Sequence, residues 1–480
     1  MSRTLKNKSD SQIRVTLVLP QQEVPVWLRN LLISLREAEH ISLCIVPVVT
    51  EQRPGEAASR VFDAWKWLDA KAFRRKISAA EHSESLLDIS REFDAEQSAG
   101  FSTATLDDID CCFGRHRSDV IIWMLPDRPP AGTISAAKLG VWTIADAFNK
   151  AYGFREIVGS EHVTRCDLVI FGNSPGDDRI LSTTFVATDS LSLARGINRV
   201  RAKCEALLLA TITGAYRRAG LDNDRSQGNA VDRVVGVIPG ILQLGWGLLR
   251  IYSRYLRGLL TRPFYFDQWQ IAYRLGGGRL DQEGLLRLAP PHRGFWADPF
   301  VAEKDGHRFI FFEEFLEETA RGHIAAIEIG PKGEVGQAIN VLQSEHHLSY
   351  PFLFEYEGSL YMVPECAESG RVEVFRCKEF PHSWEPYAVL LDGVRAFDPT
   401  LIEHDGMWWM FVTIQHDRNS TDDELHLFYA PGPFDEWTAH PLNPIRIDVR
   451  SARPAGSLFT EQGKLFRPAQ DCSVRYGWAI

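Results

Sequence analysis

The feature that most constrains the fold of this 480-residue chain is a segment that recurs four times in its C-terminal part. Each copy has a polar or aromatic residue before a proline, then a short apolar run, an acidic turn and a glycine. The copies begin at Asp298, Tyr350, Asp398 and Arg453, and they start 52, 48 and 55 residues apart. A second apolar run follows each glycine. Four copies that agree in this way predict one structural unit that is repeated.

A period near 50 residues with several short strands in each unit is typical of the blades of a β-propeller. Proline can begin an innermost strand because its missing N–H is not needed in the ladder, and the acidic residue and glycine make the turn. We therefore predict an all-β propeller over residues 266–480. The run Trp269–Arg274 is left over, and the last copy stops where a strand begins. We expect a propeller that is incomplete at the C-terminus.

The N-terminal part has a different pattern. The apolar runs Ile13–Leu19 and Ile41–Val49 enclose a stretch with apolar residues at helical spacing, Val26–Leu35. This β-α-β order, with strands that are apolar throughout, indicates a parallel sheet that is covered on both faces. We predict an α/β, Rossmann-like domain over residues 13–216.

Residues 217–265 are predicted to be a helical connector. The stretch from Val234 to Leu249 carries no charge, and Arg233, Arg250, Arg254 and Arg257 flank it. One interpretation is a helix packed between the domains. The other is peripheral contact with a membrane through residues 234–257, with the arginines as anchors. The stretch is shorter than the roughly 20 apolar residues of a membrane span.

Composition excludes some classes of protein. The net charge of −10 and the pI of about 5.8 argue against a nucleic-acid partner, which calls for a basic face. The eight cysteines are scattered and form no CxxC motif, so we expect reduced thiols, no metal site and a cytoplasmic protein, with membrane association as the second possibility. Because the N-terminus is polar, we expect no signal peptide there.

Five motifs of the repeat region carry a resemblance to a known family. They are Phe295–Phe300, Ser349–Phe352, Met362–Cys366, Phe397–Thr400 and Arg467–Cys472. With them, residues 265–480 are similar to the propeller domain named after plant glucosamine inositolphosphorylceramide transferase. The Asp-Pro strands also resemble the five-bladed glycosidases that include arabinanases, invertases and levansucrases. The resemblance implies a five-bladed type of propeller that acts on carbohydrate.

The N-terminal part resembles a divergent formyltransferase domain through Val24–Trp27, Ser118–Ile122 and Gly140–Ile144. Formyltransferases use an Asn, a His and an Asp, and the resemblance implies 10-formyltetrahydrofolate as cofactor if the domain is active. Here Asp146 is the remaining candidate, and no His stands beside it. A general base without its positioning partner is weak, so we expect the domain to be silent for formyl transfer.

Glycoside chemistry needs two carboxyl groups, one as proton donor and one as base or nucleophile. We predict Asp298 as base or nucleophile, Glu365 as acid, and Asp398 as a residue that holds substrate hydroxyls or tunes the pKa of the acid. The alternative is that Asp before Pro only accepts local backbone N–H groups at a strand start. Tyr350 and Arg453 at the equivalent positions break the set of inner-strand carboxylates of arabinanases.

We expect further residues to bind substrate at the same opening of the propeller: Trp296, Tyr350, Arg453, Arg467 and Asp471. The two arginines suit a phosphate or a sugar acid, or ion pairs with Asp398 and Asp471. The leading hypothesis is a protein of surface glycan or glycolipid metabolism that transfers or hydrolyses a glycosyl group, with a carbohydrate or nucleotide sugar as ligand. The alternatives are a propeller that only binds glycan and a formyltransferase that modifies an amino-sugar nucleotide.

Overall fold

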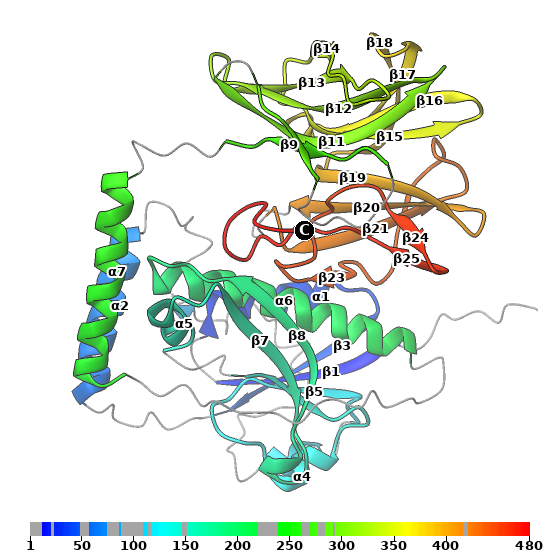
Figure 1. Cartoon of the computed structure of the whole chain (residues 1–480). Helices are drawn as coiled ribbons and strands as arrows, with labels where there is room; N and C mark the ends of the chain where they lie inside the picture. Colours follow the sequence, from blue (N-terminus) through cyan, green and yellow to red (C-terminus); the bar gives the residue numbers. More distant parts are fainter. Residues whose placement is uncertain are drawn as a thin grey trace, which may run out of the picture. The chain divides into compact units, whose positions relative to one another are not determined.

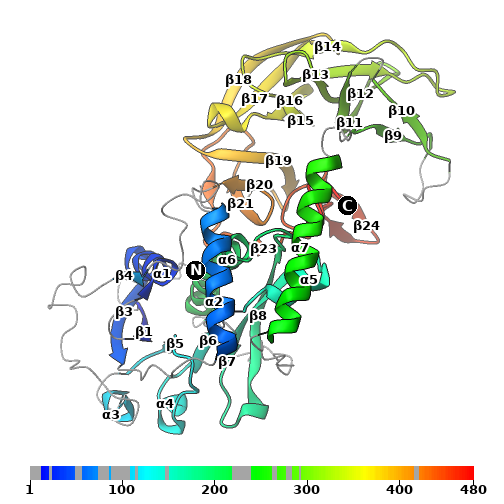
Figure 2. The same ribbon diagram turned by 90° about the vertical axis from the view of Figure 1, so that its left-hand side faces the viewer.

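The computed structural model describes residues 12–20, 24–48, 57–73, 86–87, 109–113, 117–145, 151–218, 239–261, 268–276, 284–290, 293–415 and 421–480. The chain divides into two compact units, Met1–Gly258 and Leu259–Ile480 (Figure 1). Unit 1 contains a mixed sheet with helices, and unit 2 is built almost entirely from antiparallel strands (Figure 2).

The sheet of unit 1 has the order β3-β1-β5-β6-β7-β8. Its strands are β1 (Ile13–Pro20), β3 (Ile41–Val48), β5 (Val120–Trp123), β6 (Val141–Ile144), β7 (Val163–Ile170) and β8 (Arg179–Ala187). The first four in spatial order pair in parallel, whereas β7 runs antiparallel to both β6 and β8. Two short strands, β2 (Val24–Pro25) and β4 (Leu86–Leu87), pair with each other. The apolar runs of the sequence thus form the central strands.

Seven helices lie in the described part of unit 1 or extend from it: α1 (Val26–Glu37), α2 (Ala57–Phe73), α3 (Ile109–Phe113), α4 (Ala131–Ser135), α5 (Phe154–Gly159), α6 (Leu193–Arg218) and α7 (Ile241–Thr261). The long helix α6 packs against α1, α2, β7 and β8. Leu28, Leu31, Leu32 and Leu35 of α1 are fully buried, which matches their helical spacing.

The prediction of a Rossmann-like α/β domain of the formyltransferase type is wrong. A doubly wound sheet needs parallel strands, each followed by a helix that covers the sheet. Here two pairs at one side of the sheet are antiparallel, and α3, α4 and α5 have only five, five and six residues. The reason for the error is that an apolar run shows burial but not strand direction.

Unit 2 contains three antiparallel sheets that follow one another along the chain. The first is β11 (Gly294–Lys304), β12 (His307–Leu316), β13 (Arg321–Glu328) and β14 (Ile339–Leu342); the second is β15 (Ser349–Tyr356), β16 (Ser359–Glu365), β17 (Arg371–Glu379) and β18 (Ser383–Asp392). The third is β19 (Arg395–His404), β20 (Met407–Gln415), β21 (Glu424–Ala430) and β22 (Thr438–Ala439), with β23 (Arg446–Ile447) also paired to β21. Two hairpin-like pairs complete the described strands, β9 (Ile271–Tyr273) with β10 (Leu286–Leu288), and β24 (Phe459–Glu461) with β25 (Lys464–Phe466).

The first strands of the three sheets are neighbours in space, β11 beside β15 and β15 beside β19. The sheets therefore fan out from these inner strands as blades of a β-propeller (Figure 2). A five-bladed type was expected. Among the described residues of unit 2, however, only three sheets have four or more strands, and the fourth copy of the repeat contributes the two-stranded β24–β25 pair. The repeated segment therefore predicts a whole blade only where it is followed by the outer strands of that blade.

Each inner strand carries the same irregularity at the residue before proline. The register shifts between Ala297 and Phe300, between Ser349 and Phe352, and between Phe397 and Thr400. Within these bulges Asp298, Tyr350 and Asp398 have φ values of 52°, 45° and 52°. A left-handed backbone is unfavourable for non-glycine residues and is concentrated at functional sites. The bulge re-aims one side chain out of the regular alternation of the strand.

Candidate functional site

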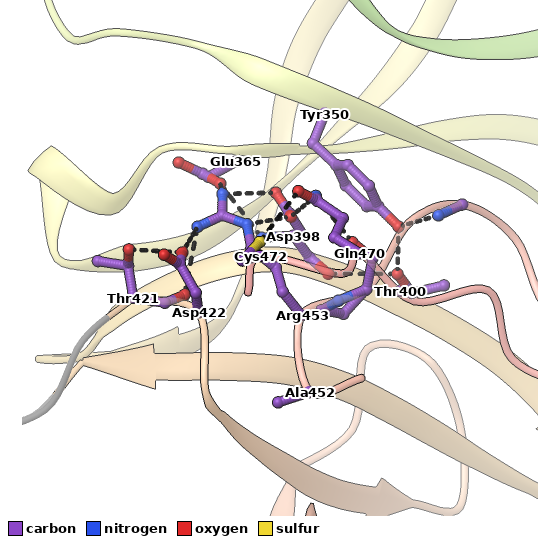
Figure 3. A network of polar contacts seen from close by, with 12 residues as sticks. Tyr350, Glu365, Asp398, Thr400, Thr421, Asp422, Ala452, Arg453, Gln470 and Cys472 are labelled. Atoms are coloured by element: carbon purple, nitrogen blue, oxygen red, sulfur yellow. Dashed lines mark hydrogen bonds and ion pairs between the residues drawn. The ribbon is translucent and has the colours of Figure 1, made fainter. Parts of the chain in front are cut away.

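The guanidinium group of Arg453 lies at the centre of a network of polar contacts in unit 2 (Figure 3). Arg453 is 4% exposed and holds Asp398 through two hydrogen bonds, from Nε to Oδ2 at 2.7 Å and from Nη2 to Oδ1 at 3.2 Å. Gln470 donates a third hydrogen bond to Oδ2 of Asp398 at 3.0 Å. A two-pronged pairing of this kind fixes the positions of both side chains.

Glu365, at the end of β16, joins the same guanidinium. Its Oε2 accepts from Nη2 of Arg453 at 3.1 Å and from the backbone N–H of Asp398 at 3.3 Å. Burial, and then the charge of Asp398, raise the pKa of Glu365 well above its ordinary value, although Arg453 opposes this. Glu365 therefore holds a proton more readily than an ordinary glutamate does.

Asp298 is the third predicted carboxyl group, and it belongs to the same electrostatic environment. Its carboxyl group accepts a hydrogen bond from the backbone of Tyr350 and interacts with the charges of Glu313, Asp398 and Arg453. Burial, followed by repulsion from Glu313 and Asp398, raises the pKa of Asp298 well above its usual range. Asp298 is less buried than Asp398 and Glu365. The structure thus brings the three predicted carboxyl groups together.

Tyr350 occupies the bulge of the second blade and is 2% exposed. Its hydroxyl group hydrogen-bonds Thr400 Oγ1 at 2.8 Å and accepts from the backbone N–H of Gly456 at 2.8 Å. Its phenol group thereby connects the second blade to the third blade and to the segment that carries Arg453. Tyr350 was predicted to bind substrate, but the structure places it inside the protein as a link between blades.

Three other predicted substrate residues lie in structural roles. Trp296 is 4% exposed and donates from Nε1 to Glu314 Oε1 at 2.9 Å. Arg467 donates to backbone carbonyl groups of residues 451, 452 and 468. Asp471 accepts from the backbone N–H of Ser473 at 2.9 Å, as a turn residue does. Asp146, the candidate of the N-terminal part, lies outside the described residues.

Several members of the site were not predicted. Gln470 binds Asp398. Asp422 binds Arg453, whose Nη1 donates to Asp422 Oδ1 at 3.2 Å. The ring of Tyr476 stacks on the guanidinium of Arg453, with its centroid 4.8 Å from Cζ. Gln470 follows Arg467, Pro468 and Ala469 directly, so this motif could have indicated Gln470 as a residue of the site. Nothing in the sequence indicates the position of Asp422, which comes from a turn in the third blade.

A second pair of charged residues flanks Asp298. Glu313 is 5% exposed, and its Oε1 lies 3.1 Å from Nε2 of His347. Nδ1 of His347 accepts from the backbone N–H of Gly322 at 3.0 Å, so Nε2 carries the proton and donates to Glu313. The hydrogen bond to Glu313 raises the pKa of His347 above its ordinary value. Within the described residues no group of His, Cys, Asp and Glu is arranged to hold a metal ion.

The raised pKa of Glu365 predicts a pH-dependent difference in stability. A carboxyl group whose pKa is raised in the folded protein keeps its proton at pH values where the unfolded chain has lost it. Its contribution to the free energy of unfolding therefore falls as pH rises from the ordinary pKa of 4.5 through the pKa of the folded protein. The free energy of unfolding of Glu365→Gln, minus that of the unaltered protein, should therefore increase with pH. The increase should amount to about 1.4 kcal/mol for every pH unit that separates the folded pKa of Glu365 from the unfolded one. Urea unfolding from about pH 3 to pH 8 measures it.

Glu385→Gln is the matched control, because a hydrogen bond from Arg376 lowers the pKa of Glu385. The free energy of unfolding of Glu385→Gln, minus that of the unaltered protein, should fall as pH rises. The fall should lie between the lowered pKa of Glu385 in the folded protein and its ordinary pKa of 4.5. Equal pH profiles of the two variants would contradict the assignment of a proton to Glu365.

Comparison with known proteins finds a similarity over part of the chain. Residues 289–480 match the family model described as glucosamine inositolphosphorylceramide transferase 1, N-terminal. The relatives of that name are 35% identical over 205 residues in Oryza sativa subsp. japonica and 34% identical over 190 residues in Arabidopsis thaliana. These alignments cover 40% and 39% of this chain, but only 27% and 25% of the relatives. The chain therefore spans about a quarter of the length of these proteins.

Solved structures give a weaker likeness. An exo-beta-1,3-galactanase from Phanerochaete chrysosporium is 11% identical with a TM-score of 0.30, and covers 37% of this chain and 43% of its own. A GH43_1 enzyme from Xanthomonas citri is 13% identical with a TM-score of 0.30, and covers 40% of this chain and 70% of its own. A likeness at this level says nothing about the chemistry of unit 2. The resemblance of the first part of the chain to formyltransferases finds no support in these comparisons. Residues 289–480 are similar to the segment that the family model of glucosamine inositolphosphorylceramide transferase 1 describes.

Proposed function

We propose that unit 2 is a carbohydrate-active module that transfers or hydrolyses a glycosyl group at the centre formed by Asp298, Glu365 and Asp398. The observation that carries the proposal is that three carboxyl groups in different environments meet there. Arg453 holds Asp398 through two hydrogen bonds, whereas burial raises the pKa values of Glu365 and Asp298. Glycosyl chemistry needs a protonated acid beside a carboxylate.

The roles follow from these environments. Glu365 acts as the acid, because burial and the charge of Asp398 favour its protonated form. Asp298 acts as the base or nucleophile, since its side chain is less buried than those of Glu365 and Asp398 and is the most accessible of the three to a substrate. Asp398 sets the proton affinity of Glu365, and Arg453 keeps Asp398 in place. The strained bulges at residues 298 and 398 agree with a functional use of these positions.

Access for a sugar is proposed from the side of Asp298 and the C-terminal aromatic residues. Tyr476 is 46% exposed and Trp478 is 52% exposed, and the ring of Trp269 lies 6.3 Å from that of Tyr476. Flat aromatic surfaces of this kind suit the apolar face of a sugar ring. Because Tyr476 also stacks on Arg453, it connects this surface to the buried carboxyl groups.

The relatives support a sugar as ligand. Their name pairs glucosamine with a transferase activity on inositolphosphorylceramide, and the matching segment contains all three carboxyl groups. For this chain we infer only the substrate class, a sugar donor or an oligosaccharide. The carboxyl groups serve transfer and hydrolysis equally well, since the two reactions differ in the acceptor.

The test is a panel of nucleotide sugars, including those of amino sugars, and of oligosaccharides, assayed with the full chain for thermal shift and for product. Asp298→Asn should keep the thermal shift of the best ligand and lose at least about 100-fold in turnover. Glu355→Gln, at an exposed position of β15, is the control and should keep both. Full turnover by Asp298→Asn would refute the catalytic roles. A thermal shift without any product in the unaltered protein would instead assign unit 2 to glycan binding alone.

A further inference from the structure

One face of α7 in unit 1 carries a row of exposed apolar side chains. Leu242, Trp246, Leu249, Leu256 and Leu260 are 83%, 66%, 61%, 57% and 73% exposed. They are spaced by 4, 3, 7 and 4 residues, which places them on one side of a helix. Tyr252, Tyr255 and Leu259 are also exposed and widen the row. The row runs for about 27 Å along the helix axis.

The opposite face of α7 is fixed to unit 1. Leu244, Gly247 and Ile251 are buried, and a Cβ at Gly247 would lie 2.8 Å from the ring of Phe154. Arg254 donates from Nη2 to the carbonyl group of Ile157 at 2.6 Å. The helix is therefore held in one orientation, and its apolar row is directed away from the core of unit 1.

The charge of α7 is opposite in sign to that of the chain as a whole. The helix has three arginines and no acidic residue, whereas the chain has a net charge of −10. Arg250, Arg254 and Arg257 are spaced by four and three residues, so they follow one edge of the apolar row. A row of leucine and aromatic side chains with a basic edge is typical of a helix that lies in a membrane interface.

Helix α2 contributes to the same side of unit 1. In Figure 2 both helices lie on the side that faces the viewer, and both supply residues to the apolar cluster around Phe154. Trp67 and Leu68 of α2 are 60% and 55% exposed, and Nζ of Lys71 lies 4.9 Å from the ring of Trp67. The second helix thus repeats the combination of exposed apolar rings and a cation.

We propose that α7, together with α2, docks unit 1 on the surface of an anionic lipid membrane. Insertion across the bilayer is not implied, because none of the helices in the described ranges is long and apolar enough to span it. A second copy of the chain is a poorer occupant. An antiparallel two-fold pairing of α7 would place arginines against arginines, with no acid on either helix to pair with them. This inference concerns unit 1 and does not rest on the carbohydrate function of unit 2.

The test is sedimentation of the full chain with vesicles of phosphatidylcholine alone or with about 30% phosphatidylglycerol. The unaltered protein should bind the anionic vesicles, and Trp246→Glu with Leu256→Glu should reduce the bound-to-free ratio at least tenfold. Arg257→Gln should reduce it less, and only on the anionic vesicles. Val301→Glu with Val389→Glu is the matched control, since these exposed valines lie on β11 and β18 of unit 2.

Folding of the variants is checked by circular dichroism. Leu242→Gln with Leu260→Gln is a second pair that adds no charge, and it should also lose binding. It replaces the first pair in the test if the two glutamates harm the fold. Failure of the unaltered protein to bind anionic vesicles would overturn the proposal, as would undiminished binding by both altered pairs. A dimer in analytical ultracentrifugation that either pair dissociates would assign the face to a second copy instead.

Discussion

Replacing Arg453 with methionine is expected to destabilise unit 2 by about 3–5 kcal/mol, the usual cost of leaving buried charges without their partner. The guanidinium of Arg453 is the shared donor to Asp398 and Glu365, and both carboxyl groups are at most 8% exposed. Without it, Asp398 would remain as a buried carboxylate with Gln470 as its side-chain donor. Urea unfolding followed by tryptophan fluorescence measures the loss.

Arg371→Met is the matched control for this variant. Arg371 pairs with Asp392 at 3.0 Å, but the two side chains are 50% and 70% exposed. A surface pair of this kind contributes little to stability, because solvent screens it. The loss in Arg453→Met should also shrink at low pH, where the carboxyl groups take up protons. Equal losses in the two variants would mean that Arg453 does not hold the centre together.

Glu365→Gln is expected to lower kcat by about 10³ on the best substrate of the panel, while the affinity for sugar stays within a few fold. Glutamine keeps the size of the side chain but cannot donate a proton to a leaving group. In the unaltered protein the rate should fall as pH rises through the raised pKa of Glu365, because the acid then loses its proton. That alkaline limb should be absent from the residual rate of the variant.

A substrate with a good leaving group separates this role from a structural one. Such a substrate needs no proton from an acid, so Glu365→Gln should regain most of its rate on an activated aryl glycoside. No recovery would show that Glu365 acts only by positioning Asp398 and Arg453, and the proposed acid would then have to be another group.

The strands of unit 2 could be predicted from sequence because their pattern is repeated. The residue before proline marks the bulge of β11, β15 and β19, and the glycine turns lead into β12, β16 and β20. That a bulge lies at this residue was not predictable, because one extra residue in a strand does not measurably change a repeat of about 50 residues. In unit 1 the apolar runs predicted strands, but the antiparallel direction of β7 is set by connections that apolarity does not encode.

The candidate site was predictable only in part. Asp298, Glu365 and Asp398 could be singled out because Asp-Pro and Val-Pro-Glu are short motifs with a stated chemical reason. The ion pair of Arg453 with Asp398 was one of the expected alternatives, but the contact of Arg453 with Glu365 was not expected, since it joins residues 88 positions apart. Trp296 and Tyr350, which were expected to bind substrate, are 4% and 2% exposed, a burial that their motifs do not indicate.

The left-handed bulge at residues 298, 350 and 398 has a consequence for how such a centre can change over time. The bend belongs to the main chain and persists whether Asp or Tyr occupies it. Replacing the residue at any of the three places would therefore change the chemical group that the bulge presents and leave the neighbouring strand pairing intact. Divergent members of such a lineage could then acquire different reactions at the same three points of one framework.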